Sequence, residues 1–271
     1  MKLLSPAKLN LFFRVLKKRE DGFHEIVTLM QAISLCDQLE ITLASEDSFS
    51  CNHPDLPLDG SNFILQAREL FRKESGFEHP LSIQLTKKIP MQGGVGGGSG
   101  NVATLLFALN QLSGLEIDEL ILQEWSSRIS SDAPFFFSGG RAYVTGRGEK
   151  VRSLDPQGSD SFYLAKPDKI AVSTPRVYAH WRPEHHFIEP REHIDFNHFG
   201  INDLEIPAFA LYPELKEAKQ KLLSLGFEVV GMSGSGSSFF CVGSIARPQI
   251  GGFQFWKVSS IFRKPGRWYT L

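Results

Sequence analysis

A run of glycines placed directly before a predicted helix is the strongest chemical signal in this sequence. Between Ile89 and Asn101, six of the thirteen residues are glycine. Apolar residues then recur at helical spacing from Val102 to Leu112, with Ser99 or Asn101 as the expected N-cap. Free backbone N–H groups and the positive end of a helix dipole bind phosphate well, and glycine lets the chain approach the anion closely.

The type of glycine loop narrows the class of protein. A flexible Gly/Ser linker is the alternative, but a linker rarely leads directly into a strongly periodic helix. The Walker A pattern is excluded because Ser99-Gly100, and not Lys-Ser/Thr, follows Gly98. No window has the spacing G-x-G-x-x-G, which excludes the dinucleotide-binding and protein-kinase loops. The sequence therefore predicts a phosphate loop of another type.

Four polar residues are candidates for the chemistry beside this loop. Lys8 and Asn10 alternate with apolar residues over 3–15, which predicts a strand with both on one face. A lysine at a sheet edge that only extends its ammonium to water is the alternative. Asp132 lies between a predicted helix and an aromatic strand, where a carboxylate is costly unless it is paired or functional; a capping role is equally compatible. His24 follows a turn, and a lone histidine is more often structural.

Length and composition indicate a soluble globular protein of about two domains. The chain has 271 residues, of which 42% are hydrophobic and 22% charged, and its formal net charge is -1. This balance argues against a nucleic-acid binder that works by phosphate neutralisation. The cysteines at 36, 51 and 241 lack disulfide or zinc spacing, and no signal peptide or transmembrane run is expected. We expect a cytoplasmic protein without nucleic-acid, membrane or obligate protein partners.

Short elements must position the candidate residues. Ser61 or Asn62 is expected to cap the first helix, and loops are expected at 44–61 and 180–200. The second loop holds five of the eight histidines without metal-ligand spacing. Helices are expected at 62–71, 102–112, 116–129 and 212–226, and strands at 3–15, 38–43, 81–86, 162–165, 170–172, 228–230 and 239–243.

Two features stay open at this level. A second glycine stretch at 231–238 precedes a strand, where a simple hairpin turn would also need glycine. Lys87 and Lys88, just before the first glycine run, are equally compatible with surface solubility and with attraction of an anion. A polar stretch at 151–161 suggests a boundary between domains at 1–150 and 151–271.

Three segments together resemble the motifs of the GHMP small-molecule kinases, namely residues 5–11, 90–103 and 231–236. Within that superfamily, residues 6–11, 21–24 and 131–137 resemble the 4-diphosphocytidyl-2-C-methyl-D-erythritol kinases. The likeness is close over 3–145 and weaker beyond. It implies an α+β, two-domain GHMP kinase fold, with an N-terminal ribosomal-protein-S5-like domain and a C-terminal ferredoxin-like domain.

The resemblance also implies an activity. Kinases of this group phosphorylate the 2-hydroxyl of 4-diphosphocytidyl-2-C-methyl-D-erythritol with ATP, giving the 2-phosphate and ADP in the non-mevalonate isoprenoid pathway. Lys8 and Asp132 would then carry the chemistry. A carboxylate accepts the alcohol proton, and an ammonium favours the ionised carboxylate and offsets charge on the transferring phosphoryl group. Magnesium is expected with ATP, without a dedicated protein metal site.

The remaining site residues follow from the same resemblance. Asn10 and His24 would recognise cytosine, stacked between Phe23 and Tyr178, with Thr174 nearby. Asn62 would lie by the adenine. The ATP-binding residues implied are Asn62, Pro90, Met91, Gln92, Gly93, Gly94, Val95, Gly96, Gly97, Gly98, Ser99 and Gly100.

The sequence departs from the family pattern at several positions without losing a group that the chemistry needs. These are Ser61, Phe23 in place of the usual tyrosine, Gln92, Gly100 and Ser130-Ser131. Another GHMP kinase, acting on homoserine or mevalonate, is the nearest alternative, and residues 21–24 and 131–135 argue against it. A second alternative is a catalytically inactive nucleotide-binding module, and retention of Lys8 and Asp132 argues against this alternative.

Overall fold

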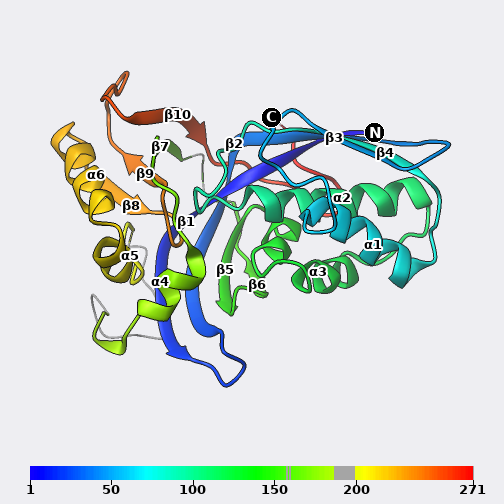
Figure 1. Ribbon diagram of the computed structural model, residues 1–271, viewed down its shortest axis with the longest axis horizontal. Coiled ribbons are helices and arrows are strands. Elements are labelled where there is room, and N and C mark those ends of the chain that lie inside the picture. The colour runs from blue at the N-terminus through cyan, green and yellow to red at the C-terminus, as the bar shows by residue number, and fades with distance from the viewer. Residues whose placement is uncertain (157, 159, 186–198, 271) are drawn as a thin grey trace.

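Two β-sheets organise the molecule (Figure 1). The computed structural model describes residues 1–156, 158, 160–185 and 199–270. The six-stranded sheet has the order β3-β4-β2-β5-β6, with β1 paired to β2, and the four-stranded sheet has the order β10-β7-β9-β8. The strands are β1 (Lys2–Lys18), β2 (His24–Leu43), β3 (Ser48–Cys51), β4 (Leu81–Thr86), β5 (Arg141–Gly146), β6 (Lys150–Ser153), β7 (Ser161–Pro167), β8 (Val229–Met232), β9 (Phe239–Val242) and β10 (Phe253–Ser259).

The long antiparallel pair of β1 and β2 joins the two halves of the molecule. Every residue from Ser5 to Val15 in β1 is buried. Leu9 and Leu11 belong to a core shared with β7 and β9, whereas Phe13 and Val15 pack in the core of the second sheet. Because both faces of β1 are covered, the predicted split into a polar and an apolar face is only partly right. Lys8 and Asn10 do share a face, since their side chains hydrogen-bond each other.

Helices cover one side of the first sheet (Figure 1). They are α1 (Phe63–Ser75), α2 (Gly97–Ser113), α3 (Glu119–Ser127) and the 3-10 helix η1 (Ala133–Phe137). The Asn62 side chain caps α1 by accepting a hydrogen bond from the Ile64 amide, as expected. The expected N-cap of α2 was wrong, because Gly96 in the left-handed region is the cap and the glycines themselves form the first turn.

The second sheet carries its own helices. These are α4 (Thr174–His180), η2 (Pro183–His185), α5 (Glu205–Leu211) and α6 (Pro213–Ser224). Buried Leu215 and Leu222 of α6 pack with Phe239 of β9, at the helical spacing that the sequence pattern indicated. Among the described residues, no helix is both long and apolar enough to cross a bilayer.

Several local expectations differ from the structure. The aromatic segment after Asp132 is a 3-10 helix and not a strand, because Pro134 fits the first turn of a helix. Residues 170–172 form no strand, and the expected loop 44–61 contains β3. The expected boundary between residues 150 and 151 lies inside β6, which pairs with β5 of the first sheet. Within the expected loop 180–200, residues 186–198 lie outside the described part of the chain.

Candidate active site

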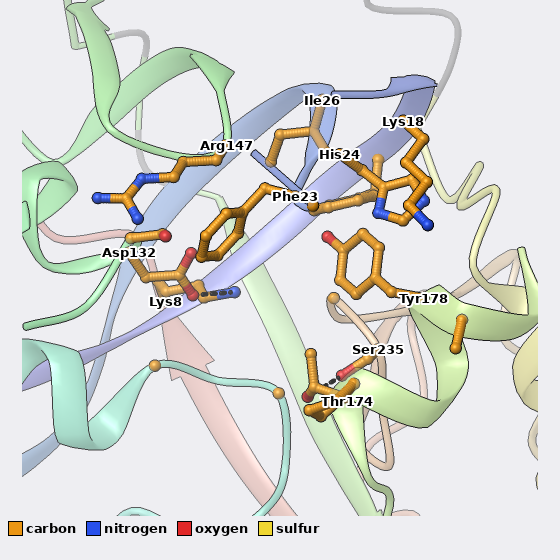
Figure 2. Close-up of a pocket in the computed structure, with 18 residues that line it drawn as sticks. Lys8, Lys18, Phe23, His24, Ile26, Asp132, Arg147, Thr174, Tyr178 and Ser235 are labelled. Atoms are coloured by element: carbon orange, nitrogen blue, oxygen red, sulfur yellow. Dashed lines mark hydrogen bonds and ion pairs between the residues drawn. The ribbon is translucent and has the colours of Figure 1, made fainter. Parts of the chain in front are cut away.

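An ion pair between Lys8 and Asp132 forms the centre of the site. The Lys8 Nζ atom lies 3.2 Å from Oδ2 of Asp132, and the lysine side chain is 4% exposed against 32% for the aspartate. Asp132 occupies the N-cap position of η1, yet its side chain makes no capping hydrogen bond. The capping alternative is therefore wrong, and the carboxylate is oriented toward the ammonium (Figure 2).

Buried polar contacts hold Lys8 in this position. Its Nζ donates to Oδ1 of Asn10 at 2.5 Å, and its backbone N–H donates to the Val95 carbonyl at 2.9 Å. The amide nitrogen of Asn10 donates to the hydroxyl of Thr28 at 2.9 Å. Asn10 is 1% exposed and uses both ends of its side chain, so it positions Lys8 and does not face the cavity that was expected to take cytosine.

The two glycine stretches pack against each other. The Ser233 hydroxyl donates to the Gly94 carbonyl at 3.1 Å, and the Ser238 amide donates to the Gly93 carbonyl at 3.1 Å. A β-carbon at Gly94, where φ is +71°, would overlap the Ser233 carbonyl oxygen. The second stretch is therefore more than a hairpin turn, because it supports the first glycine stretch from the other sheet.

Two cavities meet at this junction. The first, of about 490 Å³, is lined by Lys8 and Asp132 together with Phe23, His24, Tyr178 and others. The second, of about 520 Å³, is lined by Asn62 and by all the residues from Pro90 to Ser99. Gly94, Gly96 and Thr174 line both cavities. A phosphoryl group held by the glycine loop could therefore reach the ion pair from the second cavity.

Aromatic rings line the far end of the first cavity (Figure 2). The His24 ring lies 5.1 Å from Tyr178 and 5.5 Å from Trp181, measured between ring centroids. Burial, and then the positive charge of Lys18, lowers the pKa of His24, so its imidazole is neutral at pH 7. Burial, with a smaller contribution from the charge of Asp132, raises the pKa of Tyr178, so its phenol stays protonated.

Comparison with known proteins identifies the family. The models of the GHMP kinases N terminal domain and of the GHMP kinases C terminal match residues 62–140 and 183–248. A 4-diphosphocytidyl-2-C-methyl-D-erythritol kinase of Protochlamydia amoebophila (strain UWE25) is 45% identical over 275 residues, covering 100% of this chain and 93% of that protein. The chain belongs to the 4-diphosphocytidyl-2-C-methyl-D-erythritol kinase family.

Two further similarities agree. The chloroplastic kinase of this family from Arabidopsis thaliana is 43% identical over 266 residues, covering 92% of this chain and 69% of that protein. A crystal structure of 4-(cytidine 5'-diphospho)-2C-methyl-D-erythritol kinase matches with a TM-score of 0.77 and 34% identity, covering 90% of each chain. The expected α+β GHMP kinase fold is thereby confirmed.

The expected site residues line one or both of the two cavities, with the exception of Asn10 and Gly100. Asn10 lies behind Lys8, as described above. Gly100 is the other exception, because it lies in the first turn of α2, where a β-carbon would be 2.6 Å from the Pro6 carbonyl oxygen. Gly100 thus permits close packing of the glycine loop on β1 and does not line the second cavity.

Sequence reasoning missed residues that act through tertiary contacts. Lys18, Arg147 and Ser235 line the first cavity. The Ser235 hydroxyl is hydrogen-bonded to that of Thr174, at a distance of 2.7 Å. The Ser130 hydroxyl, a departure from the family pattern, lies 2.7 Å from that of Ser99 and ties the Asp132 segment to α2. No local pattern marks these residues, because each contact joins distant parts of the chain.

The structure places the two lysines before the glycine run differently. Lys87 forms an ion pair with the buried carboxylate of Asp37, which also accepts hydrogen bonds from the amides of Lys88 and Ile89. A β-carbon at Gly97 would lie 3.2 Å from the Lys87 Nζ atom. The Lys87 ammonium is therefore fixed beside the glycine loop by its ion pair with Asp37, whereas the Lys88 side chain is exposed.

Proposed function

We propose that this protein transfers the γ-phosphoryl group of ATP to the 2-hydroxyl of 4-diphosphocytidyl-2-C-methyl-D-erythritol, giving the 2-phosphate and ADP. The observation that carries the proposal is the position of the Lys8–Asp132 pair at the junction of the two cavities. The names of the 45% identical and 43% identical relatives supply the substrate.

The chemistry requires few reactive groups. Asp132 accepts the proton of the substrate hydroxyl. The hydroxyl oxygen bonds to the γ-phosphorus while the bond from that phosphorus to the departing ADP breaks. Lys8 favours the ionised carboxylate and offsets the negative charge on the phosphoryl oxygens. Backbone N–H groups of the loop and the N-terminus of α2 would hold the phosphates. The Lys8 side chain is almost fully buried, and electrostatic interactions are stronger where water is excluded.

We assign the nucleotide to the second cavity and the cytidyl acceptor to the first. Asn62 and residues 90–99 line the nucleotide side, while Phe23, His24, Thr174 and Tyr178 line the acceptor side. Mg²⁺ would accompany ATP as the phosphate counter-ion, a role in which phosphate oxygens and water supply most ligands. Among the described residues, no group of three His, Cys, Asp or Glu side chains could hold a metal.

Charge in the acceptor cavity favours an anionic acceptor. Lys8 is paired with Asp132, but no carboxylate of the described chain lies within ion-pair distance of the other lining cations, Lys18 and Arg147. The Arg147 guanidinium lies 4.9 Å from the centre of the Phe23 ring and donates to the Ser127 carbonyl. A diphosphate between a nucleoside and a polyol is an acceptor group that suits these cations.

Arg147→Met is expected to weaken acceptor binding. Removing one charge-assisted contact of about 1.5–3 kcal/mol raises the KM for the acceptor at least about tenfold, with the KM for ATP unchanged. Arg152→Met is the matched control, because the Arg152 guanidinium lies 5.3 Å from the Tyr143 ring and outside both cavities. Steady-state kinetics with each substrate varied gives both constants. An unchanged acceptor KM in Arg147→Met would remove Arg147 from the acceptor site.

Direct detection of the product tests the proposal as a whole. The purified protein is incubated with Mg-ATP and 4-diphosphocytidyl-2-C-methyl-D-erythritol and followed by phosphorus NMR. We expect a new phosphomonoester on the methylerythritol and an equal amount of ADP. Turnover of homoserine or mevalonate instead would indicate another GHMP kinase, and ATP binding without turnover of any alcohol would indicate an inactive nucleotide-binding module. A cytoplasmic location and independence from a protein partner remain predictions.

A further inference from the structure

The segment after β10 returns from the second sheet to the first (Figure 1). Residues 260–270, called the strap below, begin with a bridge between Ser260 and Ile33 of β2. The Ile261 amide donates to the Ala32 carbonyl at 3.0 Å, and the Arg263 amide donates to the Gly139 carbonyl at 3.1 Å. The strap therefore crosses the junction where η1 leads into β5.

The strap is built into the core and does not merely lie on it. Four of its side chains are buried, those of Ile261, Arg263, Trp268 and Tyr269. The Arg263 guanidinium lies 5.2 Å from the centre of the Trp268 ring and forms an ion pair with Glu119 at the start of α3. A buried guanidinium with a carboxylate partner fixes this stretch of chain at one end of α3.

Trp268 contacts three elements that carry or adjoin parts of the active site, namely β1, α2 and η1. Its Nε1–H donates to the Leu4 carbonyl at 2.8 Å, in the strand that contains Lys8. Its ring stacks on Phe107 of α2 at 4.7 Å and meets Phe137 of η1 edge-on at 5.6 Å. The helix α2 begins in the glycine loop, and η1 begins directly after Asp132. One side chain thus joins the elements of the lysine, the carboxylate and the phosphate loop.

Asp132 depends on such support because its own side chain has little. It makes no capping hydrogen bond, and among the described residues its side chain forms one ion pair, with Lys8. The backbone that follows it must therefore set where the carboxylate lies. Phosphoryl transfer is sensitive to that position, since misplacement by about 1 Å can cost about 100-fold in rate.

We propose that the strap is a positioning element which, through Trp268, holds the η1 segment and β1 at the separation that places Asp132 against Lys8. The proposal rests on the catalytic role given to Asp132 above. Trp268 itself lines neither cavity, so it should contact neither substrate. Its removal should therefore act on turnover and leave the binding of both substrates nearly intact.

Trp268→Leu tests this with a split between kcat and KM. We expect kcat, corrected for the folded fraction, to fall about 10- to 100-fold, with KM for ATP and for the acceptor within about twofold. Trp268→Phe keeps a ring against Phe107 but loses the hydrogen bond to Leu4 and part of the indole surface, so its kcat should fall by less, about fivefold. Phe227→Leu is the matched control, since Phe227 is a buried ring, 4% exposed, that lies 5.9 Å from the Tyr163 ring and lines neither cavity.

Hydrogen exchange provides a readout that needs no substrate. The amides of residues 133–139 should exchange faster in Trp268→Leu than in Phe227→Leu at equal global stability. Loss of stability in Trp268→Leu with unchanged kcat and unchanged exchange at 133–139 would overturn the proposal. If Trp268→Leu does not fold, the same two measurements on Trp268→Phe decide, because wild-type values for both would also overturn it. Absence of turnover in the wild-type protein would contradict the proposed function. The positioning role of the strap would then be tested by hydrogen exchange alone.

Discussion

Asp132→Asn is expected to abolish most turnover while leaving ATP binding intact. Asparagine has nearly the same shape but accepts no proton from the attacking hydroxyl, so kcat should fall by about 10²–10⁴-fold. The Asp132 side chain lies on the acceptor side and outside the nucleotide-side cavity, which predicts an unchanged Kd for an ATP analogue. Single-turnover kinetics and a nucleotide titration measure the two quantities.

The same substitution at a capping aspartate provides the control. Asp118 is the N-cap of α3 and accepts a hydrogen bond from the Leu120 amide at 2.8 Å. Asparagine caps helices equally well, so Asp118→Asn should retain both kcat and stability. Near-normal turnover in Asp132→Asn would contradict the assignment of Asp132 as proton acceptor and would show that its charge is not needed for turnover.

Gly94→Ala is expected to damage both the fold and the phosphate loop. Its φ of +71° disfavours any side chain, and the new β-carbon would overlap the Ser233 carbonyl and lie 2.8 Å from that of Gly236. Left-handed strain of about 1–2 kcal/mol and overpacking of about 1–3 kcal/mol should together destabilise the protein by about 2–5 kcal/mol. Since both obstacles are backbone atoms, the loop must shift, and kcat/KM for ATP should fall at least about 100-fold.

Gly76→Ala separates strain from overpacking. Gly76 ends α1 with a φ of +73°, and a β-carbon there would meet nothing within 4 Å. This variant should lose about 1–2 kcal/mol of unfolding free energy from strain alone and keep its activity. Denaturant unfolding and ATP kinetics on both variants make the comparison. Equal losses of stability in the two variants would show that the contact between the glycine stretches contributes nothing.

Local patterns predicted much of the fold. The apolar periodicity of α1, α6, β4 and β7 follows from residues close together in sequence, and the Asn62 cap needs only its own first turn. The same reasoning failed for η1, where a run of three phenylalanines indicated a strand but Pro134 and burial favour a tight helix. It also missed α4 and α5, which are short and are held by packing on the second sheet.

The candidate catalytic side chains and the glycine motifs could be predicted from the sequence, because side-chain type and glycine spacing are local properties. The sequence by itself determined the family that these motifs resemble, and it predicted a phosphate loop and candidate roles for Lys8 and Asp132. Only the tertiary structure decided that Asn10 supports Lys8, that the second glycine stretch holds Gly94, and that Trp268 joins β1 to η1. Each of these contacts joins segments far apart in the chain, so it depends on how the two sheets pack and not on any local propensity.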